Sequence, residues 1–364
     1  MENYSIIISG GGTGGHIYPA LSIAKGLKTS FPKMKFLFVG AKGRMEMEKV
    51  PKAGFSIVGL WISGFDRFNK FKNILLPIKL LISLLQSLFI LKRFKPNVVI
   101  GTGGYASGPL LYIASIFRVP ILIQEQNSYP GITNRLLGNK AQSICVAYPG
   151  LSKFFPAEKI NLTGNPVRQD LFNVDEKRLE GKLYFNQNIK IKTLLILGGS
   201  LGSKRINELV EKQLDFFKAN NIQLIWQCGS LYFDQYKSYQ DKDLVYITPY
   251  IKRMDLAYAA SDFIISRSGA SSVSELCIIG KPVIFIPSPN VSEDHQTINA
   301  RMIADKKAAV IIEEKSLNND FEKCFSKLLN SKNLQITLSN NIKKLAKPLA
   351  TEKIINEVKT LLKG

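Results

Sequence analysis

The feature that most constrains the fold of this chain is a short apolar strand that leads directly into a glycine-rich loop, found in both halves. Ser5–Ser9 precedes the loop Gly10–Gly15, and Thr193–Leu197 precedes the loop Gly198–Gly202. Strands that are apolar along their whole length are typical of parallel sheets covered on both faces. Helical stretches follow the loops, so the pattern predicts βαβ units and a doubly wound α/β fold.

Further short β-branched runs continue this alternation in each half. The other expected strands are residues 35–39, 97–100, 120–123, 143–147, 223–227, 244–248, 262–266, 282–287 and 309–313. A chain of 364 residues fits two domains. Asn165–Pro166 is a turn signal, so we expect Rossmann-like domains over residues 1–164 and 165–345. The two domains would face a cleft, and ligands would bind beyond the carboxyl ends of the strands.

Composition and charge narrow the functional classes. The four cysteines lie far apart, with no CxxC pair, which argues against a zinc site or a disulfide framework and favours a reducing compartment. The N-terminus lacks a basic segment, so we expect a first strand rather than a signal peptide. The net charge of +21 suits anionic lipid, phosphorylated ligands or nucleic acid. Because no nucleic-acid-binding motif occurs, we expect no such partner; a basic surface without a ligand is the alternative.

The glycine-rich loops indicate phosphate binding. Gly10, Gly12 and Gly15 satisfy GxGxxG, but Gly40–Lys42, which ends the second strand, offers no acid for an NAD ribose. A third loop, Gly101–Pro109, follows another strand. Glycines let the backbone approach an anion, and the following helix presents unpaired amides. Three such loops predict two phosphorylated substrates, although any one loop could be a tight turn without a ligand.

The segment Arg267–Glu275 allows two interpretations. Ser272 and Glu275 have the spacing of a capping box. Alternatively, the helix start binds a diphosphate and Glu275 accepts hydrogen bonds from ribose hydroxyls. Further along the chain, the polar residues 293–300 also allow two interpretations. They either bind sugar hydroxyls or form a solvated loop.

Both histidines of the chain, His16 and His295, lie in these loops. An imidazole exchanges its proton close to neutral pH, so His16 is the first candidate for a general base. A packing or orienting role for His16 is the alternative. Glu125, just after a strand, is the second candidate base.

A long apolar stretch, Ile74–Leu91, is flanked by Lys72 and other basic residues. Lys79 near its middle would cost about 2.5–3.5 kcal/mol in a bilayer, which argues against a membrane span. We expect a helix on the first domain whose surplus apolar surface, including Ile74, Leu75 and Leu76, docks on anionic lipid. A fully buried core helix is the alternative.

Taken together, these motifs and their order resemble the MurG family over essentially the whole chain. The motifs are Gly10–Pro19, Gly101–Pro109, Glu125–Asn127, Pro130–Asn134, Gly164–Arg168, Gly198–Gly202, Arg267–Glu275 and His295–Gln296. One departure is Gln124, where many members of the family have histidine.

The resemblance implies a GT-B fold, with a C-terminal helix over residues 346–364 that returns to the first domain. It implies an inverting glycosyltransferase without metal or cofactor. GlcNAc would pass from UDP-GlcNAc to the MurNAc 4-hydroxyl of lipid I, undecaprenyl-pyrophosphoryl-MurNAc-pentapeptide, giving lipid II and UDP. The enzyme would work peripherally at the cytoplasmic face of the cell membrane; membership of a cell-wall synthesis complex stays open.

The resemblance also assigns site residues. Gly103, Gly104 and Tyr105 would bind the acceptor diphosphate, with His16 or Glu125 as the base. The residues assigned to the donor are Thr13, Gly14, Gly15, Asn127, Arg168, Ser200, Ile251, Ala270, Ser271, Ser272, Val273, Ser274, Glu275 and Gln296. Rival functions are a transferase acting on another lipid, a UDP-GlcNAc 2-epimerase and a nucleic-acid binder.

Overall fold

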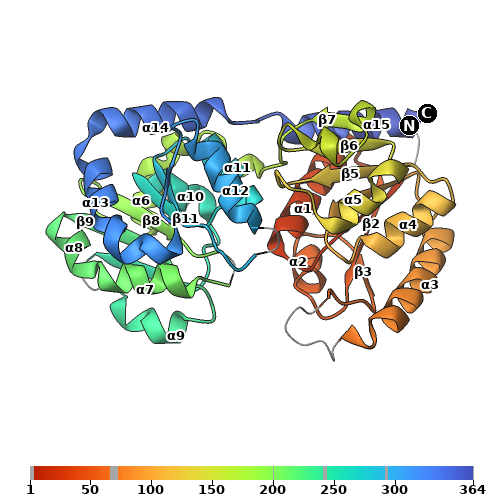
Figure 1. The fold of residues 1–364 in the computed structure, drawn as a ribbon, viewed down its shortest axis with the longest axis horizontal. Helices are drawn as coiled ribbons and strands as arrows, with labels where there is room; N and C mark the ends of the chain where they lie inside the picture. The colour runs from red at the N-terminus through yellow and green to blue at the C-terminus, as the bar shows by residue number, and fades with distance from the viewer. Residues whose placement is uncertain (1–3, 66–72, 200, 241–243, 292–293, 364) are drawn as a thin grey trace. The chain divides into compact units, whose positions relative to one another are not determined.

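The computed structural model describes residues 4–65, 73–199, 201–240, 244–291 and 294–363. The chain divides into two compact units. Unit 1 comprises residues 1–167 and 348–364, and unit 2 comprises residues 168–347. Each unit is an α/β domain with its own parallel sheet (Figure 1).

In the described residues of unit 1, seven parallel strands form one sheet in the order β3-β2-β1-β4-β5-β6-β7. The strands are β1 (Ser5–Gly10), β2 (Lys35–Ala41), β3 (Ile57–Leu60), β4 (Val98–Gly103), β5 (Ile121–Glu125), β6 (Ser143–Val146) and β7 (Ile160–Leu162). The five strands expected in this half are confirmed, whereas β3 and β7 were not predicted. Both are edge strands of three or four residues, too short for a clear apolar pattern.

Helices cover both faces of this sheet, because successive strand residues point to opposite sides. Ile6 and Ile8 lie in one buried cluster with residues of α1 and α15, whereas Ile7 lies in a second cluster with residues of α4. The helices are α1 (Gly14–Ser30), α2 (Glu46–Lys52), α3 (Leu76–Phe94), α4 (Gly108–Ile116), α5 (Ile132–Leu137) and α15 (Ala350–Lys363).

The last helix, α15, belongs to unit 1 although it follows unit 2 in the chain. It packs on α1 (Figure 1). Gly26 of α1 allows this approach, because a Cβ there would lie 2.7 Å from Cδ1 of Ile355. Ile354 and Val358 complete the cluster that also contains Ile6.

Unit 2 repeats the plan with a six-stranded parallel sheet, in the order β10-β9-β8-β11-β12-β13 over its described residues. Its strands are β8 (Lys192–Leu197), β9 (Ile222–Gln227), β10 (Val245–Thr248), β11 (Phe263–Ser266), β12 (Val283–Phe285) and β13 (Val310–Ile311). Its helices are α6 (Arg178–Tyr184), α7 (Lys204–Lys212), α8 (Leu214–Ala219), α9 (Phe233–Tyr236), α10 (Met254–Ala260), α11 (Ala270–Ile279), α12 (His295–Ala304), α13 (Leu317–Asn330) and α14 (Lys332–Lys344). All six expected strands are present.

Helix α3 packs on unit 1 through its polar side. Ser83 and Ser87 are fully buried, and Lys79 Nζ donates to Ser63 Oγ at 3.1 Å. Leu81 and Phe89, on the other side, are 61% and 70% exposed. The alternative of a fully buried core helix is therefore wrong: Ser83, Ser87 and, near the end of the helix, Leu91 face inward, whereas most of the large apolar side chains are partly or largely exposed. No helix in the described ranges is long and apolar enough to span a bilayer.

Candidate functional site

Each sheet changes its winding direction once, and the predicted loops lie at that point. In unit 1 the chain runs from β1 outward through β2, then returns to β4 on the other side of β1. In unit 2 the reversal lies between β8 and β11. Loops that leave the carboxyl ends of such neighbouring strands diverge to opposite faces, which makes this edge the usual ligand site of α/β sheets.

The first glycine loop of unit 1 is held in place by hydrogen bonds to a buried carboxylate. Glu46, at the start of α2, is fully buried and accepts hydrogen bonds from the amides of Gly12 (3.2 Å) and Ala41 (2.9 Å). A Cβ on Gly11 would lie 2.1 Å from its Oε1. Glu46 thus fixes the loop between β1 and α1. The sequence did not predict this role, because Glu46 lies beyond the end of β2 and its contact with Gly12 depends on the fold.

The loop after β4 packs directly against this first loop. Gly104 has φ +80, and a Cβ there would lie 2.3 Å from the carbonyl oxygen of Gly11. At Gly103 a Cβ would lie 3.0 Å from Nδ1 of His16. The predicted acceptor loop and the predicted base are therefore brought together within unit 1.

Tyr105 follows these glycines, and its ring lies against Gly12 and Gly64. Its hydroxyl is buried and has no hydrogen-bond acceptor among the described residues, because the neighbouring guanidinium of Arg44 can only donate. Burial raises the pKa of this phenol, so the hydroxyl keeps its proton. A protonated hydroxyl without an acceptor is a donor available to an anionic ligand.

His16 lies in the first turn of α1, between the two glycine loops. Its Nδ1 is 3.0 Å from the carbonyl oxygen of Thr102 and 3.1 Å from Oε1 of Gln126. In the described part of the chain no hydrogen bond involves its Nε2. A carbonyl oxygen only accepts, so the neutral ring carries its hydrogen on Nδ1 and a lone pair on Nε2.

Glu125, the second candidate base, is 1% exposed, and both of its oxygens are engaged. Oε1 accepts from the Asn127 amide at 2.9 Å, and Oε2 accepts from the Gly131 amide at 3.1 Å and from Nδ2 of Asn134 at 2.8 Å. This carboxylate organises the loop after β5. The geometry therefore favours His16 over Glu125 as the group that takes a proton.

The start of α1 is open. Thr13 and Gly15 are exposed, and the Thr13 side chain makes no capping hydrogen bond. The first amides of this helix, including that of Gly14, therefore have no side-chain cap. Asn127, from the loop after β5, is half-buried.

In unit 2 the loop after β8 likewise packs closely against the backbone of another loop. Gly202 has φ +85, and a Cβ there would lie 2.1 Å from the carbonyl oxygen of Cys228. Ser203 caps α7, and Arg267 donates to its Oγ at 2.6 Å while pairing with Glu314 at 2.5 Å. Ser200, predicted to contact the donor, lies outside the described residues.

Helix α11 begins at Ala270, and its N-cap residue is Gly269, which has no side chain to cap the helix. Ser272 lies inside the helix, so the capping-box interpretation of Ser272 and Glu275 is wrong: the chain turns into the helix three residues earlier. The Oγ of Ser271 is buried without a partner among the described residues. Ala270 and Val273 turn their side chains into the core, and Ser274 donates to the carbonyl of Ala270 at 3.0 Å.

Glu275 extends from α11 towards buried groups of unit 2. It accepts a hydrogen bond from the hydroxyl of Tyr258 at 3.1 Å. Burial raises its pKa to about 7, against the opposing charge of Arg168. Arg168 itself donates from Nε to Asp170 at 2.9 Å. A carboxylate that is half-protonated at neutral pH is characteristic of a functional site.

The other donor residues are placed as follows. Oε1 of Gln296, at the start of α12, accepts from the Ser288 amide at 3.0 Å, and its carbonyl oxygen accepts from Ser268 at 2.8 Å. The start of α12 is thus tied to the loop before α11. The side chain of Ile251 is 3% exposed and packs in the core of unit 2, so only its backbone is left for recognition.

Comparison with known proteins identifies the family. The glycosyltransferase family 28 N-terminal domain matches residues 6–146, and the family 28 C-terminal domain matches residues 193–354. Proteins named UDP-N-acetylglucosamine–N-acetylmuramyl-(pentapeptide) pyrophosphoryl-undecaprenol N-acetylglucosamine transferase are 58% identical in Flavobacterium psychrophilum (all of this chain, 99% of that protein) and 55% identical in Christiangramia forsetii (99% and 98%).

The chain belongs to the MurG family of glycosyltransferases. The crystal structure of Acinetobacter baumannii MurG superposes with a TM-score of 0.76 at 27% identity, covering 99% of this chain and 100% of that one. The S. aureus MnaA–UDP structure gives a TM-score of 0.69 at 16% identity, covering 99% and 97%. At that identity it shows the fold alone. The GT-B fold with two Rossmann-like domains is confirmed.

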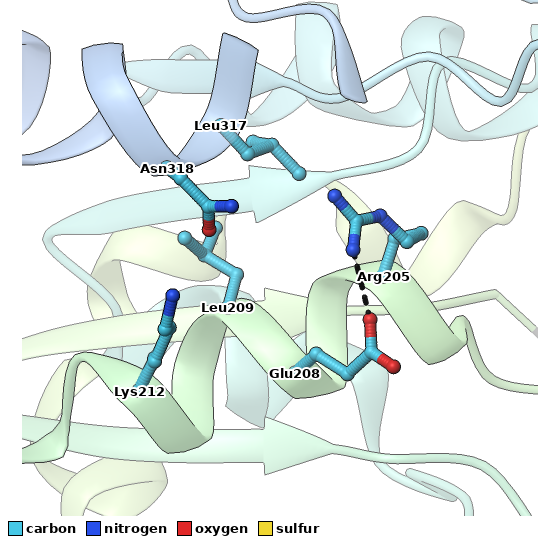
Figure 2. Close-up of a pocket in the computed structure, with 6 residues that line it drawn as sticks. All are labelled: Arg205, Glu208, Leu209, Lys212, Leu317 and Asn318. Carbon is cyan, nitrogen blue, oxygen red and sulfur yellow. Dashed lines mark hydrogen bonds and ion pairs between the residues drawn. The ribbon is translucent and has the colours of Figure 1, made fainter. Parts of the chain in front are cut away.

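Two cavities of this MurG family member lie away from the predicted residues. One, of about 280 Å³, lies between α7 and α13 (Figure 2). Its lining residues are Arg205, Glu208, Leu209, Lys212, Leu317 and Asn318. The other, of about 380 Å³, includes Lys192 and Asp262 at the amino ends of β8 and β11. Neither is lined by a predicted site residue, so we do not assign the site to them.

We expect Glu46→Ala to destabilise unit 1. The substitution leaves buried amides unpaired, which costs about 1–3 kcal/mol per group. Urea unfolding followed by hydrogen exchange at β1 and the first glycine loop measures the change. Glu48→Ala in the same helix is the matched control: that glutamate is exposed and forms a surface ion pair with Lys52, so we expect a change within about 0.5 kcal/mol. Equal stability of the two variants would contradict the structural role of Glu46.

Proposed function

We propose that this chain transfers GlcNAc from UDP-GlcNAc to the MurNAc 4-hydroxyl of lipid I, giving lipid II and UDP. The full-length identity to relatives named for this transfer supports the substrates. The observation that carries the chemistry is His16, whose ring lies against Gly103 and Gly104 and whose Nδ1 faces the carbonyl of Thr102, which leaves the lone pair on Nε2.

On the acceptor side, we assign Gly103, Gly104 and Tyr105 to the diphosphate of lipid I. The glycines allow the backbone to approach phosphate oxygens. The hydroxyl of Tyr105 would donate to one of them. In this assignment the acceptor diphosphate would lie next to His16.

The transfer itself needs one base. Nε2 of His16 takes the proton of the acceptor hydroxyl as its oxygen forms a bond to C1 of GlcNAc. The bond between C1 and the UDP oxygen breaks, and its electrons leave with UDP. Because the nucleophile attacks opposite the leaving group, the anomeric configuration inverts. A positioned general base of this kind contributes about 10²–10⁴-fold to the rate.

On the donor side, we assign the start of α11 to the diphosphate of UDP-GlcNAc. The N-terminus of α11 and the Oγ of Ser271, which has no partner among the described residues, would stabilise the charge that develops on the departing UDP. Glu275 would accept hydrogen bonds from the ribose, and Arg168 beside it would contact the nucleotide.

Other residues complete the proposed donor site. Gln296 would bind GlcNAc hydroxyls, and the backbone of Ile251 would contact uracil. Thr13, Gly14, Gly15 and Asn127 would face the donor sugar from unit 1.

We also propose that unit 1 docks on the cytoplasmic face of the cell membrane through α3. The outward side chains of Ile74, Leu75, Leu81 and Phe89 are large and apolar, with Leu76 half-buried beside them. Lys92 and Arg93 follow at the end of the helix and are exposed. Lys72, the predicted basic neighbour at its start, lies outside the described residues. Apolar groups framed by cations match an anionic bilayer surface.

One assay tests the proposed reaction. Purified protein is incubated with UDP-GlcNAc and either lipid I, diacylglycerol or no acceptor. We expect UDP release and lipid II only with lipid I. Transfer to diacylglycerol alone would indicate another lipid substrate, and conversion of UDP-GlcNAc without an acceptor would indicate an epimerase.

His16→Ala should reduce turnover by about 10²-fold or more, because the acceptor proton loses its base. The KM for UDP-GlcNAc should stay close to the wild-type value, since donor contacts are assigned mainly to unit 2. Steady-state kinetics with lipid I measures both. A variant with wild-type turnover would leave His16 with a packing role.

The affinity for UDP-GlcNAc should rise with pH. The pKa of Glu275 is raised to about 7, so the side chain is largely protonated at lower pH and becomes a carboxylate, the better acceptor for ribose hydroxyls, at higher pH. Between about pH 6 and about pH 8 the dissociation constant should fall by up to about tenfold.

Isothermal titration with UDP-GlcNAc measures this trend, because the sugar diphosphate has no titrating group in the interval. Glu275→Gln is the matched control, since it keeps the size but cannot ionise. Its affinity should be weaker and independent of pH. A pH dependence retained in Glu275→Gln would assign the titration to another group.

Leu81→Glu should weaken binding to vesicles that contain anionic lipid by about tenfold or more, since burying one leucine contributes about 1.5–3 kcal/mol. Vesicle co-sedimentation measures the partition. Leu231→Glu is the control, because Leu231 is equally large and 70% exposed but lies in unit 2. Equal loss in both variants would argue against α3 as the docking surface.

A further inference from the structure

A row of buried side-chain amides lies behind His16. Gln126, Gln124 and Asn165 are each at most 2% exposed. Oε1 of Gln126 is 3.1 Å from Nδ1 of His16, and Nε2 of Gln126 is 2.5 Å from Oε1 of Gln124. Nε2 of Gln124 is in turn 3.0 Å from Oδ1 of Asn165. The imidazole is thus the last member of a chain of four hydrogen-bonded side chains.

Backbone carbonyls fix the direction of this chain. Nε2 of Gln126 also faces the carbonyl oxygens of Thr102 at 2.8 Å and Gln124 at 3.0 Å. Nδ2 of Asn165 donates to the carbonyl of Gln126 at 3.0 Å. Because a carbonyl oxygen only accepts, an amide nitrogen must stand at each of these positions. The oxygen of Gln126 therefore faces His16, and the oxygen of Asn165 faces Gln124.

We infer that Gln124 and Gln126 are positioning residues that hold neutral His16 in the tautomer with hydrogen on Nδ1 and a lone pair on Nε2. This inference rests on the proposed role of His16 as the base. The carbonyl of Thr102, 3.0 Å from Nδ1, favours the same tautomer. If the amide of Gln126 turned over, its nitrogen would donate to Nδ1 in competition with that carbonyl, which would stabilise the ring with hydrogen on Nε2. That ring could not take a proton from the acceptor hydroxyl. Gln124 opposes the turn, because its oxygen accepts from Gln126.

The tautomer is directly measurable, because the chain has only two histidines. Long-range ¹H–¹⁵N spectra of protein labelled with ¹⁵N-histidine distinguish a protonated ring nitrogen from one with a lone pair. The spectrum of His16→Gln identifies the signals of residue 16. We expect neutral His16 in the wild-type protein to show hydrogen on Nδ1. Hydrogen on Nε2 would overturn the inference.

Two substitutions at Gln124 test its role. Gln124→Met keeps the length of the side chain but can neither accept from Gln126 nor donate to Asn165. Gln124→His offers one ring nitrogen as acceptor and the other as donor, so it can preserve both links. We expect Gln124→Met to populate the Nε2–H tautomer and to lower turnover at least about tenfold, part of the contribution of a positioned base. Gln124→His should recover most of both properties.

The kinetic pattern separates positioning from general damage. In Gln124→Met the KM for UDP-GlcNAc should stay at the wild-type value while kcat falls. If Gln124→Met keeps the wild-type tautomer and turnover, the inference is overturned. If it does not fold, the wild-type spectrum still decides the tautomer, and Gln126→Met tests the link next to the ring. Absence of GlcNAc transfer by the wild-type protein would contradict the proposed function, which the spectra do not address.

Discussion

Both units depend on close backbone contact between loops that follow neighbouring strands of the sheet, β1 and β4 in unit 1 and β8 and β9 in unit 2. In unit 1, Gly104 lies so near the carbonyl of Gly11 that a Cβ has no room, and in unit 2 Gly202 has the same relation to Cys228. These contacts bring the loops of neighbouring strands together. In unit 1 the same arrangement positions His16, whose ring lies against Gly103 and Gly104.

The carboxylates near the proposed site have two different roles. Glu46 and Glu125 are surrounded by amides that donate to them, so their charge holds loops in place. Glu275 accepts a hydrogen bond from the hydroxyl of Tyr258, and desolvation raises its pKa. A carboxylate whose oxygens still have free lone pairs can accept hydrogen bonds from a ligand. A carboxylate whose oxygens already accept several hydrogen bonds from its own loop has few lone pairs left for a ligand.

The sequence was sufficient for the fold and for most of the loops, because apolar strands followed by glycines have few other interpretations. It was not sufficient for contacts made across the fold. Glu46 and the amide row from Gln126 to Asn165 join residues whose proximity depends on the order of the strands. The spacing of Ser272 and Glu275 suggested a cap, but the start of α11 is set by tertiary packing. For α3 the periodicity was evident, yet only the structure shows that its serines face inward.

The place of α15 has a consequence for how the protein is made. Its residues Ile354, Ile355 and Val358 belong to the same apolar cluster as Ile6 and Ile8 of the first strand. A ribosome therefore completes all of unit 2 before it delivers the segment that closes the core of unit 1. During translation unit 2 can fold as an uninterrupted stretch of chain. Part of the apolar surface of α1 in unit 1 stays exposed to water until α15 has been synthesised. Residues 1–167 expressed alone would keep that apolar surface in water and would be prone to aggregate.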